Sequence, residues 1–200
     1  MHAGNGRMWA VTLCASFVLA PFFLGQPGPS TAKQGPTPEQ EAYRQFEAKH
    51  RGLQAQAKQV FDTEMAREKT GDCPDAKTDY DFNVCFGRQL DVTDQNLKSY
   101  EDFIRDLMAP PPQMAGQPAV DTSPQANGIA GPVLSSSEFE HEFERVEQSW
   151  GQYREAACAA AFHQFDGGTG GPSFQLECKL KLARDHMREL SMIYGGELRL

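Results

Sequence analysis

The stretch WGQYREAAC, residues 150–158, places a tryptophan, a tyrosine–arginine pair and a cysteine at spacings that suit one helix. Trp150, Tyr153 and Ala157 follow one another at steps of three and four, and Arg154 stands one turn after Trp150. We interpret the stretch as a packing and cross-linking element. Trp150 then fills a core, Arg154 pairs with a carboxylate of a neighbouring helix, and Cys158 forms a disulfide to the next helix. The alternative is that Arg154 anchors an anion or a partner protein.

The N-terminal half of the chain predicts two long helices. The first starts at Pro38, where Thr37 can cap it and Gln40 can close a capping box, and it ends near Gly71. The second starts after Thr78 and ends before Pro110. The apolar positions of these two helices recur at helical spacing and are Tyr43, Phe46, His50, Leu53, Ala57 and Val60, then Phe82, Phe86, Leu90, Leu97, Tyr100, Ile104 and Leu107.

The C-terminal half predicts two more helices. One starts with Ser137 as its cap and runs to about Phe162, and the other follows a turn at residues 166–173 and runs to Tyr194. Their predicted buried positions are Phe139, Phe143, Val146, Trp150 and Tyr153, then Leu176, Leu180, Ala183, Met187 and Leu190. No alternating strand pattern occurs, so we expect an all-α fold: a small, disulfide-linked helical bundle or pair of helical hairpins with an additional N-terminal helix.

The remaining segments indicate an exported chain. Residues 1–32 have the layout of a signal peptide, in which a single Arg7 precedes an apolar run that ends in small residues. An uncleaved membrane anchor is the alternative, and this segment is the only membrane contact that we expect. We predict a tether and helix at residues 33–71 and a domain at residues 72–195. The domain is interrupted at residues 109–135 by a disordered loop rich in proline and glycine.

Four cysteines lie beyond the leader: Cys73, Cys85, Cys158 and Cys178. An even number of cysteines in an exported chain indicates two disulfides, and three connectivities are open. We favour the local pairs Cys73–Cys85 and Cys158–Cys178, each worth about 3 kcal/mol in the chain-entropy estimate. A four-thiolate zinc site is the alternative, but the sequence has no C-x-x-C pair.

The charge of the chain favours some partners over others. Its formal net charge of −8 favours basic protein partners and disfavours nucleic acid. The oligomeric state is left open by the sequence.

No catalytic, cofactor or metal site is expected from the motifs. Two Glu-x-x-His pairs, Glu47 with His50 and Glu138 with His141, match part of the ligand pattern of di-iron helical bundles. However, His141 is predicted to point to solvent, and Glu47 can form a salt bridge along its own helix. The glycine-rich GGTGG lacks the Lys-Ser/Thr of a phosphate-binding loop, and no G-x-S-x-G occurs.

Five stretches together resemble the LprI-type lysozyme inhibitor domain of bacterial envelope proteins. They are CPDAKTDYDFNVC (73–85), DQNLKSY (94–100), WGQYREAAC (150–158), GGT (167–169) and CKLKLARDHMREL (178–190). The resemblance covers roughly residues 73–194. The residues that match the motifs of the family, besides the cysteines, are Asp94, Leu97, Tyr100, Trp150, Tyr153, Arg154, Glu155, Gly167, Gly168 and Leu190.

The sequence departs from the family pattern at four polar positions. Lys98 stands where the family has Asn, Glu147 where it has Gln, Ala183 where it has Thr, and His186 where it has Arg.

The resemblance implies an exported binding protein that inhibits lysozyme by occluding it. Because lysozymes are strongly basic, exposed carboxylates are the candidate contacts: Asp72, Asp75, Asp79 and Asp81, with Arg154 as a further candidate. The alternative interpretation of the carboxylates is a solvated, helix-starting acidic face. The alternative function is a non-inhibitory module of the cell envelope that uses the helix at residues 37–70 for partner binding or self-association.

Overall fold

The structure, a computed structural model, describes residues 35–112, 136–165 and 168–198. In these ranges it has four helices and no strand: α1 (Pro38–Thr70), α2 (Asp79–Leu107), α3 (Ser136–His163) and α4 (Gly171–Leu198). The predicted all-α class is therefore confirmed. The predicted signal peptide at residues 1–32 and most of the predicted loop at residues 109–135 lie outside the described residues.

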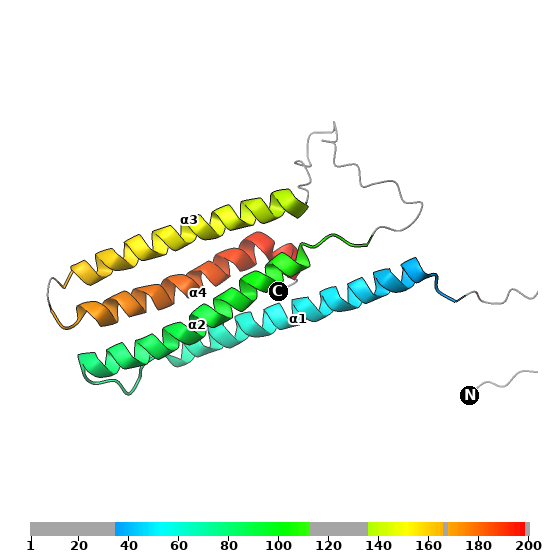
Figure 1. The fold of residues 1–200 in the computed structure, drawn as a ribbon. Coiled ribbons are helices and arrows are strands. Elements are labelled where there is room, and N and C mark those ends of the chain that lie inside the picture. Colours follow the sequence, from blue (N-terminus) through cyan, green and yellow to red (C-terminus); the bar gives the residue numbers. More distant parts are fainter. Residues whose placement is uncertain (1–34, 113–135, 166–167, 199–200) are drawn as a thin grey trace, which may run out of the picture. The chain divides into compact units, whose positions relative to one another are not determined.

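Helix α4 is the centre of the bundle (Figure 1). It packs against α1, α2 and α3, and α1 packs additionally against α2. Among the residues that the structure describes, no helix is both long and apolar enough to cross a membrane.

Helices α1 and α2 begin where they were predicted to begin, and the capping box predicted for α1 is present. The Thr37 hydroxyl accepts a hydrogen bond from the Gln40 backbone N–H, and the Gln40 side chain accepts one from the Thr37 backbone. Thr78 and Asp81 form the same capping box at the start of α2. At the end of α1, Gly71 adopts a φ of 81°, which a glycine tolerates without strain.

The predicted end of α3 is correct to within one residue, whereas its predicted start and both predicted ends of α4 are wrong by two to four residues. Helix α3 begins at Ser136, so Ser137 lies inside the helix instead of capping it. Helix α4 begins at Gly171, inside the predicted turn, because Pro172 is well tolerated in a first helical turn. It also continues past Tyr194 through two glycines to Leu198, whose burial in the core offsets the low helix propensity of glycine.

The bundle has a large core and a smaller one. The large core contains Ala57, Leu97, Tyr100, Ile104, Leu107, Phe139, Phe143, Ala183, Met187, Leu190 and Leu198. The small core contains Phe86, Leu90 and Leu180, with Phe82, Leu176 and Cys73 packed against it. The predicted apolar positions of the four helices supply all of these side chains except Leu198 and Cys73.

The predicted buried face of α3 is wrong at two positions. Tyr153 is 60% exposed and Val146 is 37% exposed. The inward face instead runs through Phe139, Phe143, Glu147, Trp150, Arg154 and Cys158, at helical steps of three and four. The prediction failed because it placed Val146 and Tyr153 on the inward face, whereas the structure places the next residue in each case, Glu147 and Arg154, on that face.

Two disulfides join the elements in the local pairs that we favoured. Cys73–Cys85 connects the loop after α1 to the second turn of α2, and Cys158–Cys178 connects α3 to α4. The sulfur atoms are therefore committed to cross-links, which leaves no four-thiolate set for zinc.

Candidate functional site

Arg154, the arginine of the WGQYREAAC stretch, forms an ion pair between α3 and α2. Its Nη2 donates to Asp94 Oδ1 on α2 at 2.6 Å, and its Nε donates to the Lys179 carbonyl oxygen on α4 at 3.2 Å. The guanidinium also lies over the Trp150 ring, 5.2 Å from its centroid. Arg154 thus holds α2, α3 and α4 together, which agrees with the packing interpretation.

Three other motif residues have clear structural positions. Leu97 and Tyr100 lie in the large core. At Gly168 a Cβ atom would lie 2.9 Å from the Phe165 carbonyl oxygen, so the tight turn between α3 and α4 requires a glycine there. Gly167 lies outside the described residues.

The four candidate carboxylates near the first disulfide have different surroundings. Asp72 pairs with Arg184, Asp81 accepts hydrogen bonds from the backbone N–H groups of Lys77 and Thr78, and Asp79 accepts one from the Thr169 hydroxyl. The hydrogen bond with the Thr78 side chain, followed by the one from the Lys77 backbone, lowers the pKa of Asp81. Asp75 is exposed on the loop.

A groove lies beside these carboxylates. Its volume is about 430 Å³, and its lining includes Asp75, Tyr80, Asp81 and Arg88 as well as the first disulfide. The Tyr80 side chain is 74% exposed. The groove therefore presents an aromatic ring, carboxylates and one cation on a frame fixed by the disulfide.

A buried ionic network joins α1 to the rest of the bundle. The Glu64 side chain is fully buried and accepts from Thr93 at 2.7 Å, from Asn96 at 2.7 Å and from Arg184 at 2.8 Å. Arg67 also pairs with it. Arg184 in turn donates to both oxygens of Asp72, at 2.6 and 2.7 Å.

The network determines the charge state of Glu64. Burial alone raises its pKa, but the hydrogen bonds from Thr93, Arg184 and Asn96 and the charge of Arg67 together outweigh burial and hold the pKa below its usual value. Glu64 is therefore a buried carboxylate that stays charged, and α1 is an integral part of the bundle.

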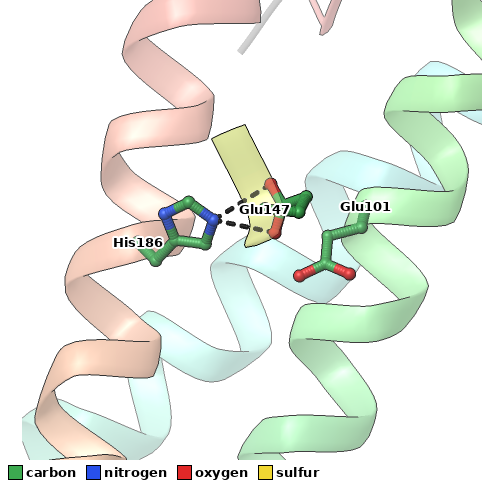
Figure 2. Close-up of side chains that lie close together, drawn as sticks. All are labelled: Glu101, Glu147 and His186. Carbon is green, nitrogen blue, oxygen red and sulfur yellow. Dashed lines mark hydrogen bonds and ion pairs between the residues drawn. The ribbon is translucent and has the colours of Figure 1, made fainter. Parts of the chain in front are cut away.

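A second polar cluster lies where α2, α3 and α4 meet (Figure 2). His186 Nε2 lies 3.0 and 3.1 Å from the two oxygens of Glu147, and the Glu101 carboxylate approaches the same space from α2. Burial, followed by the like charge of Glu147, raises the pKa of Glu101 to about 8. The two carboxylates therefore repel each other, and a proton or a cation relieves the repulsion.

Sequence reasoning missed this cluster, although one signal for it was present. Two of the four departures from the family pattern, Glu147 and His186, are in direct contact. Because we considered each departure separately, we did not expect them to compensate each other. Glu101 gave no signal of its own.

The two Glu-x-x-His pairs do not form a site with each other. His141 is exposed, as predicted, and Glu47 pairs with Arg51 along α1 at 3.7 Å. His50 lies on the packing face of α1, where its Nε2 is 3.0 Å from the Leu107 carbonyl oxygen.

The chain was compared with known proteins. No curated protein and no solved structure matches it. The model of the family described as "Lysozyme inhibitor LprI" matches residues 70–190, which is more than half of this chain. The chain therefore belongs to this family.

Proposed function

We propose that the protein is an exported binding protein that inhibits lysozyme by occluding it, and that it acts without catalysis. The observation that carries the proposal is the family match, because residues 70–190 include both disulfides and the Arg154–Asp94 ion pair. Its net charge of −8 supports the proposal, since an acidic surface accelerates encounter with a basic enzyme.

We assign the contact surface to the groove beside the Cys73–Cys85 disulfide. An exposed tyrosine is a typical anchor of protein interfaces, and Tyr80 stands among carboxylates there. Asp75 supplies an exposed charge, while Asp79 and Asp81 add negative potential from the first turn of α2. Asp72 also lines the groove, but its carboxylate pairs with Arg184, and Arg154 pairs with Asp94, so we assign neither side chain a direct contact with the enzyme.

The test is lysis of a cell-wall suspension by lysozyme in the presence of the oxidised protein. We expect near-stoichiometric slowing of lysis that weakens as salt is added. Tyr80→Ser should reduce the inhibition at least about tenfold, as truncation of an interface anchor does, and Asp75→Asn should reduce it less and weaken its salt dependence. The matched control is Asp106→Asn. It also removes one negative charge, but from the C-terminal end of α2, about 40 Å along the helix axis from the first turn.

The control should inhibit as the unchanged protein does. Equal inhibition by the groove variants and the control would refute the assignment of the surface. No slowing of lysis at tenfold excess of the unchanged protein would refute lysozyme inhibition itself.

A second candidate function is a non-inhibitory envelope module that uses α1. One observation favours it: Tyr43, Phe46 and His50 line a groove of about 340 Å³ on the N-terminal half of this helix. Deleting residues 37–70 does not separate the two functions, because it would also remove Glu64 from the buried network. Phe46→Ser leaves that network intact, and it should abolish self-association or partner capture only if the second function holds.

A further inference from the structure

Three helices direct potential metal ligands into one small space. Glu101 comes from α2, Glu147 from α3 and His186 from α4 (Figure 2), and one ligand atom from each lies within 4.8 Å of the others. The His186 side chain is only 2% exposed. One imidazole nitrogen with two carboxylate oxygens is a donor set that divalent transition metals take in proteins.

The surroundings of His186 hold its ring in the orientation of a metal ligand. Its Nδ1 lies 3.3 Å from Glu189 Oε2, and Trp150 stacks on the ring at 4.1 Å with an interplanar angle of 9°. Metal-binding histidines typically donate their second N–H to a carboxylate in this way. Both ring nitrogens of His186 therefore face carboxylate oxygens.

The cluster also has an excess of negatively charged groups, which favours the binding of a cation. Glu101 and Glu147 place two carboxylates beside each other in a partly buried position. The nearest basic groups on α2, Lys98 and Arg105, both pair with Asp102. A divalent cation would neutralise the two carboxylates without a rearrangement of these ion pairs.

We propose that Glu101, Glu147 and His186 bind one divalent transition-metal cation, with Zn²⁺ as the representative probe, and leave a fourth position for water. Zinc bonds of about 2.0–2.2 Å place tetrahedral ligand atoms about 3.3 Å apart. The 3.0 Å separation of His186 Nε2 and Glu147 Oε1 is close to this value. A small movement of the Glu101 carboxylate completes the site, and the bound ion links α2, α3 and α4.

The test uses the full oxidised chain after removal of metals with a chelator and dialysis. Zn²⁺ is titrated at pH 7.5 in competition with a chromogenic chelator, and thermal unfolding is followed with and without Zn²⁺. We expect one Zn²⁺ per chain with a Kd of about 1 μM or below. A free Zn²⁺ concentration about one hundred times the Kd should raise the Tm by about 5 °C or more. Mg²⁺ at the same concentration should not displace Zn²⁺, because it disfavours nitrogen ligands.

Two variants and two controls assign the binding to this cluster. Glu101→Gln and His186→Gln should weaken Zn²⁺ binding at least about tenfold. Glu144→Gln and His141→Gln remove the same residue types from exposed positions of α3 and should bind Zn²⁺ as the unchanged protein does. If burial of His186 prevents its variant from folding, as seen by circular dichroism, Glu101→Gln alone decides. Absence of binding at 100 μM Zn²⁺, or undiminished binding by Glu101→Gln, would overturn the proposal.

Discussion

Replacing Arg184 with methionine tests whether the buried network fixes α1 to the bundle. The Arg184 side chain is 3% exposed, and it donates to the fully buried Glu64 at 2.8 Å and to both oxygens of Asp72. Methionine keeps most of the side-chain volume and removes all of these hydrogen bonds.

The size of the stability loss in Arg184→Met depends on the partners that Glu64 and Asp72 keep. Loss of one partner of a buried ion pair costs about 3–5 kcal/mol when the other charge is left uncompensated. Glu64 still has Arg67, Thr93 and Asn96, and Asp72 is 18% exposed and can hydrate. We therefore expect a loss at the lower end, about 3 kcal/mol of the free energy of unfolding.

The assay is urea denaturation of the oxidised protein at pH 7, followed by helical circular dichroism. The double variant Glu64→Leu with Arg184→Met should be more stable than Arg184→Met alone by about 1 kcal/mol or more, because the buried carboxylate that has lost Arg184 is then removed. The control Lys98→Met breaks the Lys98–Asp102 pair, whose side chains are 73% and 49% exposed, and should change stability by less than about 0.5 kcal/mol. A cost below about 1 kcal/mol for Arg184→Met, or a double variant that loses the sum of both single losses, would refute this reasoning.

Three further predictions concern stability. Replacing Cys158 and Cys178 with serine opens a loop of 20 residues and should cost about 3 kcal/mol, measured by urea denaturation against the oxidised parent. Gly168→Ala brings a Cβ within 2.9 Å of the Phe165 carbonyl oxygen and should lower the Tm by several degrees in a thermal scan, and an unchanged Tm would contradict the tight turn. The pKa of Glu64 is lowered from 4.5, so its charge stabilises the fold above about pH 4.5, and this contribution is lost as the pH falls through the folded pKa. The stability advantage of the unchanged protein over Glu64→Gln should therefore shrink in urea titrations below that pH, and a constant difference would contradict the shift.

The helices were predictable because their signals are local. The capping boxes at Thr37 and Thr78 and the apolar spacing of α1, α2 and α4 each depend on a few neighbouring residues. The disulfide partners were favoured for a similar reason, since both pairs are close in the sequence. The family motifs were sufficient to identify the LprI family, whose model matches residues 70–190.

The polar interior was not predictable because its signals are tertiary. Glu64 and Glu147 occupy inward positions of their helices, and hydrophobic periodicity assigns charged residues to solvent by default. Arg184 and His186, with which these two carboxylates pair, are on α4, so only the assembled bundle shows these pairs. The same reasoning explains why Val146 and Tyr153 were wrongly placed in the core.

Direct titration of lysozyme with the oxidised protein in a calorimeter, at low salt and again at 0.5 M salt, tests the central claim most directly. The account predicts saturable 1:1 binding that weakens as salt increases and is lost in the Tyr80→Ser variant. Absence of binding at 100 μM protein, while the disulfides and helical signal are intact, would contradict the claim that this member of the LprI family is a lysozyme inhibitor.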